Sequence, residues 1–132
     1  MRPKTYTNQE FGALGEKLAA KYLKKNGYII LEKNYRNKLG EIDIIARKGE
    51  EIVFVEVKSR SADPYLGGAY SVDQRKQFHI LRTASAYLSE NHCDLQPRFD
   101  IIETEIDRVT GKLVRVNHYK SAFIQTEDYA RF

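Results

Sequence analysis

The first hydrophobic pattern in the chain is helical. Between Asn8 and Asn26, apolar residues recur at steps of three and four, and Gly27 follows as a stop signal. The apolar positions of this pattern are Phe11, Leu14, Leu18 and Tyr22. We therefore expect an amphipathic helix that packs this stripe against the rest of the protein.

The next segment has the composition of β-strands. The run YIILEKNY is followed by a polar turn at Asn37, Lys38 and Gly40, and then by the runs EIDIIA and EIVFVEVK. Strand-like runs joined by a short connection with glycine are typical of hairpins. We therefore expect EIDIIA and EIVFVEVK to pair as a β-hairpin that turns at Lys48 and Gly49.

A second helix follows an irregular segment. Residues 61–71 contain proline and a glycine pair without periodicity, which predicts a mobile surface loop. Ser71 and Gln74 match a capping box at a helix start. The apolar face of this helix would consist of Phe78, Leu81, Ala84 and Leu88.

The last part of the chain predicts two more strands. The runs RFDIIET and KLVRVNHY are strand-like, with a turn near Gly111 between them, and residues 121–132 are compatible with a short helix or a tail. Asp100 in RFDIIET is either a half-buried strand charge or a residue that reaches a site on a neighbouring strand. The order of elements predicts one α/β domain over residues 1–132, with a central mixed sheet flanked by helices.

Three charges interrupt the apolar runs of the hairpin. Alternation along EIVFVEVK places Glu56 and Lys58 on the same face, side by side at the end of the strand. Both faces of this strand are apolar at its start, so we expect a central strand that is covered on both sides. A hairpin that turns at Gly49 would bring Asp43 of the preceding strand close to Glu56.

The first helix contributes a fourth charge. On a helical wheel the lysines Lys17, Lys21 and Lys24 gather on one side, whereas Glu16 falls at the edge of the apolar arc near Gly12. Glycine at position 12 would let another backbone or a ligand approach closely. Glu16 is therefore a candidate for the same site as Asp43 and Glu56.

Clustered carboxylates need a cation. They repel one another, and burial raises their pKa values unless positive charge keeps them ionised. Carboxylate oxygens suit Mg²⁺ or Mn²⁺, whereas the paired histidines and thiolates of a zinc site are missing. Lys58 beside such a metal could activate water or could stay charged and stabilise a phosphorane-like transition state.

Each charge also has an ordinary structural explanation. An E-x-K pair on a strand is most often a surface ion pair worth about 0–1 kcal/mol. Asp43 could be an edge-strand charge that discourages aggregation, and Glu16 could pair with a lysine of its own helix. The joint order of helix carboxylate, strand aspartate, hairpin and strand E-x-K is harder to obtain by accident, which favours a functional site.

Composition adds a polyanion as a candidate partner. The formal net charge is +4 and the isoelectric point is about 9.1. Such basic residues would give salt-dependent affinity for phosphate, and Tyr65 and Tyr70 could stack on an unpaired base. The basic residues considered for nucleic-acid binding are Arg36, Lys38, Arg60, Arg75, Lys76 and Arg82.

Cys93 is the only cysteine, and we expect a cytoplasmic protein without a membrane span.

The pattern Asp43, twelve residues, Glu56-Val57-Lys58 resembles the PD-(D/E)XK superfamily of nucleases, which have a restriction-endonuclease-like αβββαβ core. The segments GALGEKLAAKYLKKNGY, NYRNKLGEIDIIA and VFVEVKSR look like the small bacterial YraN-type family, itself similar to archaeal Holliday-junction resolvases. This resemblance implies a Mg²⁺ or Mn²⁺ ion bound by Asp43, Glu56 and the Val57 carbonyl, completed by Glu16. Lys58 would position or activate water, and Ile42 stands where the superfamily name has proline.

Three functions are compatible with these observations. The first is a metal-dependent endonuclease acting on DNA, with branched DNA suggested by the resolvase likeness. The second is a nucleic-acid-binding module that no longer cleaves and serves a repair or recombination partner. The third is an internal ion-pair network. Action on a two-fold junction would favour a homodimer.

Overall fold

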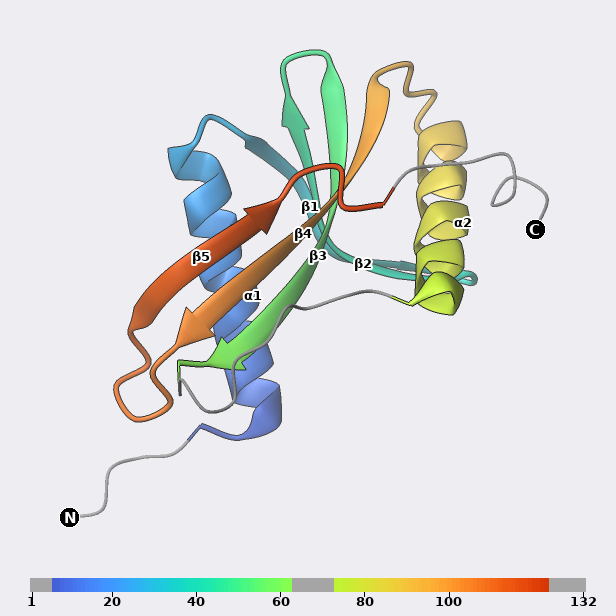
Figure 1. The fold of residues 1–132 in the computed structure, drawn as a ribbon. Helices are drawn as coiled ribbons and strands as arrows, with labels where there is room; N and C mark the ends of the chain where they lie inside the picture. The colour runs from blue at the N-terminus through green and yellow to red at the C-terminus, as the bar shows by residue number, and fades with distance from the viewer. Residues whose placement is uncertain (1–5, 63–72, 124–132) are drawn as a thin grey trace.

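The computed structural model describes residues 6–62 and 73–123 (Figure 1). The element order is α1 (Asn8–Lys25), β1 (Ile29–Asn37), β2 (Gly40–Lys48), β3 (Glu51–Ser61), α2 (Gln74–Glu90), β4 (Gln96–Ile106) and β5 (Leu113–Tyr119). The predicted αβββαβ order is therefore confirmed, with β5 following it. In the described residues no helix is both long enough and apolar enough to cross a membrane.

Local signals fix the ends of α1. Thr7 caps the helix and forms a reciprocal capping box with Glu10, which satisfies two backbone N–H groups of the first turn. At the other end Gly27 has a φ of +86°, a conformation that glycine adopts without strain. The predicted stop at Gly27 is confirmed.

The five strands form one mixed sheet in the order β1-β2-β3-β4-β5. β3 and β4 are parallel, and the connection between them contains α2, whereas the other neighbours are antiparallel. The predicted β2–β3 hairpin is confirmed, with Ile44 opposite Val55 and Lys48 opposite Glu51. β3 lies at the centre of the sheet, as its two apolar faces predicted.

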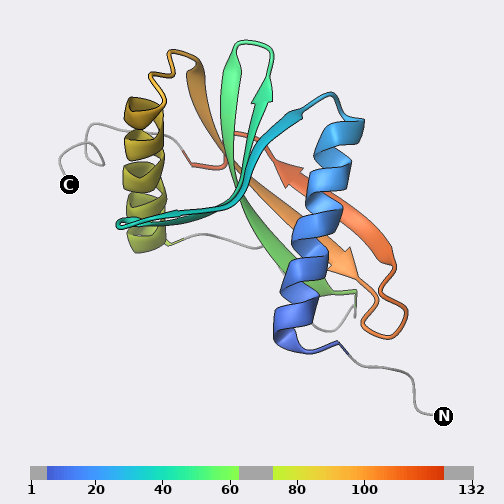
Figure 2. The ribbon, with the colours of Figure 1, turned by 180° about the vertical axis from the view of Figure 1, so that it is seen from behind.

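Each face of the sheet is covered by one helix (Figures 1 and 2). Ile52 and Phe54 of β3 point to the α2 side, while Val53 and Val55 point to the α1 side. All four side chains are almost fully buried. The alternation along β3 therefore divides the protein into two cores.

The sheet opens between β2 and β3 beyond the Ile44–Val55 pair. Residues 40–42 of β2 pair with β1 alone, and residues 56–61 of β3 pair with β4 alone. Figure 1 shows the beginning of β2 beside α2, while the end of β3 lies away from that helix. Side chains from both faces of the sheet can therefore approach the point of divergence.

The buried stripe of α1 differs from the predicted one. Phe11 is buried as expected, but Leu14, Leu18 and Tyr22 are only half-buried. Small residues dominate the buried face because they allow the helix to lie close to the sheet. A Cβ at Gly15 would overlap Ser59 Oγ and lie 2.9 Å from Thr104 Oγ1. The remaining buried residues of α1 are Ala19, Ala20 and Leu23.

The start of α2 also differs from the prediction. Asp73 is the N-cap, and its Oδ1 accepts a hydrogen bond from the backbone N–H of Lys76 at 2.8 Å. The capping box assigned to Ser71 and Gln74 is therefore wrong, because an aspartate two residues later performs this role. The predicted loop begins later than expected, because Ser61 is the last residue of β3. Residues 63–71, which include Tyr65, Tyr70 and Ser71, and residues 124–132 lie outside the described residues.

Candidate active site

The site forms where β2 and β3 separate. Oδ2 of Asp43 accepts a hydrogen bond from the backbone N–H of Val57 at 2.7 Å. This bond links the two strands one step beyond their last ladder pair, Ile44 with Val55. The side chain of Asp43 is thereby held in the gap between the strands.

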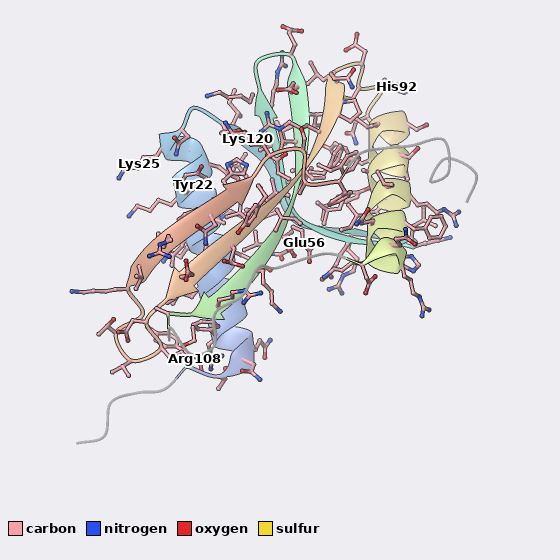
Figure 3. The ribbon with its side chains drawn as sticks, in the orientation of Figure 1. Tyr22, Lys25, Glu56, His92, Arg108 and Lys120 are labelled. Carbon is pink, nitrogen blue, oxygen red and sulfur yellow. The ribbon has the colours of Figure 1, made fainter. Side chains whose placement is uncertain are left out.

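Glu56 lies next to Asp43 on the neighbouring strand. Its side chain is only 9% exposed, and its Oε1 is 2.5 Å from the ammonium nitrogen of Lys76 in the first turn of α2. Figure 3 shows Glu56 in the middle of the molecule, where the strands diverge. The predicted proximity of Asp43 and Glu56 is confirmed, because both residues line the same cavity.

Glu16 reaches the same place from α1, on the opposite face of the sheet. Partial burial raises the pKa of Glu16, hydrogen bonds with Asn34 and Asp43 oppose that rise, and the charges of Glu41 and Glu56 add to it. The predicted position of Glu16 at the edge of the apolar arc is confirmed. Three carboxyl groups from α1, β2 and β3 therefore influence one another.

Asp43 is the most strongly perturbed member of this group. Burial and the charge of Glu56 raise the pKa of Asp43 to about 8, against the opposing effect of the Val57 N–H. Glu16 adds to the rise and the ammonium of Lys76 reduces it. Without further positive charge, Asp43 therefore holds its proton more strongly than an ordinary aspartate does.

A cavity of about 340 Å³ connects these groups. Lys58 is exposed and lines the cavity together with Glu56, which confirms their expected placement on one side of β3. Gly12 faces open space in the cavity, so it leaves room for a ligand and is not a point of close backbone approach. The full lining is Asn8, Phe11, Gly12, Glu16, Asp43, Glu56, Val57, Lys58, Ser59, Lys76 and Arg108.

The donor set fits a hard divalent cation. Within residues 6–62 and 73–123, no group of three or more histidine, cysteine, aspartate or glutamate side chains is arranged so that these residues alone could hold a metal ion. Mg²⁺ needs no such cage, since it usually takes one or two carboxylates and fills its remaining positions with water and phosphate oxygens. A cation here would relieve the repulsion that raises the pKa of Asp43.

The predicted basic residues are dispersed. Lys76 lines the cavity, whereas Arg36, Lys38, Arg60 and Arg75 do not. Arg36 pairs with Glu41 at 2.7 Å on the surface. The Nε atom of Arg60 lies 2.8 Å from Oε2 of the buried Glu103, so this arginine is committed to an internal ion pair. Lys38 in the β1–β2 turn, Arg75 and Arg82 are exposed.

Sequence reasoning missed Arg108, which lines the cavity from the turn between β4 and β5. Its guanidinium carbon lies 4.2 Å from the centre of the Phe11 ring. The turn has no periodic pattern, and Arg108 and Phe11 are far apart in the sequence. Asp107 and Gly111 predict a turn, but they do not predict that this turn lies against α1.

Asp100 belongs to a different cluster. It is fully buried, its Oδ2 lies 2.7 Å from Nε2 of His118, and it accepts hydrogen bonds from Arg98 and from the N–H of Ser121. Burial alone would raise the pKa of Asp100, but these partners outweigh it and hold the pKa below its usual range. Asp100 is absent from the cavity lining and serves the α1-side core.

The fold and the cavity define an α/β protein whose carboxyl groups meet at a break in the sheet. The family model described as "Uncharacterised protein family UPF0102" matches residues 15–104, and the chain belongs to this family. A UPF0102 protein of Caldanaerobacter subterraneus subsp. tengcongensis is 46% identical over 121 residues, which cover 91% of this chain and 99% of the relative.

Two further relatives are similar over nearly their whole length. A UPF0102 protein of Alkaliphilus oremlandii is 44% identical over 88% of this chain and 99% of its own length. One of Clostridioides difficile is 46% identical over 88% of this chain and 98% of its own length.

Proposed function

We propose that this protein is a metal-dependent endonuclease of the PD-(D/E)XK type that hydrolyses phosphodiester bonds in DNA, with branched DNA as a candidate substrate. The observation that carries the proposal is the divergence of β2 and β3. It brings Asp43, Glu56 and Glu16 together beside Lys58 in one open cavity. Repelling carboxylates gain nothing from binding phosphate directly, so a cation between them and the phosphate is the simplest explanation.

Asp43 and Glu56 are the residues that would hold the cation, with Glu16 and the Val57 carbonyl as further oxygen donors. When bound, Mg²⁺ or Mn²⁺ supplies Lewis-acid activation of water and neutralises charge on the phosphate. The Val57 N–H fixes the orientation of the Asp43 carboxylate, since it donates to one of the two carboxylate oxygens.

Lys58 provides the positive side of the site. It lies two residues after Glu56 on β3, so it lines the cavity together with the carboxylates. There it can orient the attacking water or stabilise the charge that develops on the phosphate oxygens. Both roles require Lys58 and Glu56 on the same side of the strand.

The test is a cleavage panel with labelled linear duplex, single strand, flap and four-way-junction DNA, together with RNA. Wild type is compared with Glu56→Gln and Lys58→Ala in Mg²⁺, Mn²⁺ or chelator. We expect metal-dependent cutting that both substitutions reduce by at least a hundredfold. Glu50→Gln is the matched control, because this glutamate is exposed in the β2–β3 turn and lies outside the cavity lining.

The variants also identify contamination. A contaminating nuclease would cut equally in wild type, Glu56→Gln and Lys58→Ala preparations, and this result would contradict the proposal. Cutting that persists in chelator would contradict the metal dependence. The substrate that is cut fastest defines the class of nucleic acid.

A binding module that does not cleave is the second candidate. The observation that favours it is the ion pair of Lys76 with Glu56, which neutralises one carboxylate without a metal ion. This candidate predicts that wild type binds members of the panel and never cuts them. Glu56→Gln would then bind nucleic acid at least as well as wild type.

A further inference from the structure

The turn between β4 and β5 presents an arginine to the cavity in a fixed position. Residues 107–112 are closed by several hydrogen bonds, among them Val109 N–H and Thr110 N–H to Oδ1 of Asp107, at 2.8 and 3.0 Å. The backbone N–H of Gly111 also donates to the carbonyl of Asp107 at 2.8 Å. Arg108 therefore projects from a turn with little freedom of its own.

The same turn is packed against the beginning of α1. The Tyr6 side chain lies against Gly111, whose φ of +71° and missing Cβ allow this contact. The Arg108 guanidinium lies over the buried Phe11 ring at 4.2 Å, within the range of a cation–π interaction. Figure 3 shows Arg108 at this end of the molecule, well separated from Glu56.

Arg108 differs from several other arginines in what holds it. Arg36, Arg60, Arg98 and Arg115 each pair with a carboxylate. In the described part of the chain, no carboxylate lies within ion-pair distance of Arg108. An aromatic face orients the guanidinium without using its N–H donors, which stay available for an anion.

We propose that Arg108 binds a backbone phosphate of the nucleic acid away from the phosphate that is cleaved, an inference that rests on the nuclease function proposed above. Phe11 and Glu16 are five residues apart, which is about 7.5 Å along a helix at 1.5 Å per residue. Arg108 at Phe11 therefore lines the cavity more than one helical turn from Glu16, on the side where α1 begins. Asn8 lines the same end of the cavity.

Binding without cleavage is the direct test. A fluorescent oligothymidylate and a labelled duplex are titrated in chelator, at several salt concentrations, with wild type, Arg108→Gln and Arg108→Lys. We expect Arg108→Gln to bind about tenfold or more weakly and to lower the salt slope by about 1. Arg108→Lys keeps the charge and the slope but recovers only part of the affinity, because lysine lacks the planar fork.

Arg115→Gln is the matched control, since this arginine is exposed on β5 and does not line the cavity. It should bind both probes as wild type does. Equal binding by wild type and Arg108→Gln, or an equal loss in Arg115→Gln, would overturn the inference. Thermal melting of each variant verifies that loss of binding does not reflect unfolding.

Kinetics separate the two proposals. With a cleaved substrate, Arg108→Gln should raise KM about tenfold and leave kcat within about threefold, because Arg108 does not touch the scissile phosphate. If wild type cleaves the substrate and Arg108→Gln binds nucleic acid as tightly as wild type does, only the phosphate-binding role of Arg108 is refuted. Arg108-dependent binding without any cleavage would refute the nuclease alone, and absence of binding by wild type would refute both.

Discussion

Oδ2 of Asp43 accepts the backbone N–H of Val57 at 2.7 Å, one step after the ladder between β2 and β3 has ended. A side chain thus replaces the backbone carbonyl that a continuing ladder would have offered. The hydrogen bond keeps the strands in contact while the backbones separate. This arrangement is electrostatically unfavourable, because it holds the carboxyl group of Asp43 beside those of Glu56 and Glu16.

The stability of the protein should fall as the pH rises from about 4 to about 8 in chelator. Burial raises the pKa of Asp43 to about 8, whereas an aspartate in the unfolded chain titrates near 3.9. Between these values the native state binds more protons, so the free energy of unfolding decreases with pH. Urea denaturation at several pH values measures this slope. Asp43→Asn should flatten it, and Asp94→Asn in the exposed loop should not.

Divalent metal should stabilise the protein. Mg²⁺ at a hundred times its Kd would add about 2.7 kcal/mol to the free energy of unfolding. Glu56→Gln should abolish this gain without lowering the Tm in chelator, because it removes a repelling charge beside Asp43. Differential scanning calorimetry with Glu50→Gln as control measures both quantities. A Glu56→Gln variant that is severely destabilised and indifferent to metal would support the internal ion-pair network instead.

Lys76 should compete with the metal. Its ammonium contacts Glu56 at 2.5 Å and is about half exposed, and such ion pairs are worth about 0–1 kcal/mol. Lys76→Gln should therefore strengthen Mg²⁺ binding by up to about fivefold, as measured by isothermal titration calorimetry. Lys120→Gln, an exposed lysine that does not line the cavity, should leave the affinity unchanged. Weaker Mg²⁺ binding by Lys76→Gln would show that the lysine assists the site.

Two glycines of α1 should respond in opposite ways to alanine. Gly15→Ala would place a methyl group against Ser59 and Thr104 and should destabilise the protein by about 1–3 kcal/mol. Gly12→Ala meets nothing within 4 Å and should stabilise it by about 0.5–1 kcal/mol through helix propensity. Urea denaturation of both variants tests the close packing of α1. Similar effects of the two substitutions would contradict it.

The Asp100 cluster should affect folding and not the site. Asp100→Ala removes the buried carboxylate that Arg98 and His118 share and should cost about 3–5 kcal/mol. The additional stability that saturating Mg²⁺ confers should stay the same, since Asp100 does not line the cavity. Melting curves with and without metal separate these effects. A loss of the metal response in a folded Asp100→Ala variant would link the two clusters.

The proximity of Asp43 and Glu56 was predictable because it depends on local sequence patterns. Alternation along β3 and a short turn at Gly49 determine which residues of a hairpin face one another. The exact face of α1 was not predictable in the same way. Its burial depends on how closely the helix can approach the sheet, which Gly15 decides together with Ser59 on a distant strand.

The positive side of the site was only partly predictable. The placement of Lys58 beside Glu56 could be predicted from their spacing along β3. The contact of Lys76 with Glu56 could not, because it depends on how α2 packs against the sheet. Arg60 has the same sequence signal as a phosphate-binding residue but is paired with Glu103 from β4. Arg108 contacts α1 because the turn between β4 and β5 lies beside the beginning of the helix (Figure 2).

The opening between β2 and β3 has a consequence for local unfolding. Glu16 belongs to the helix on one face of the sheet and Lys76 to the helix on the other, yet both line the same cavity. A ligand that contacts both sides would oppose the opening of either helix, because its binding free energy is lost when one side detaches. Amide hydrogen exchange in α1 and α2 would then slow together, although the sheet separates them.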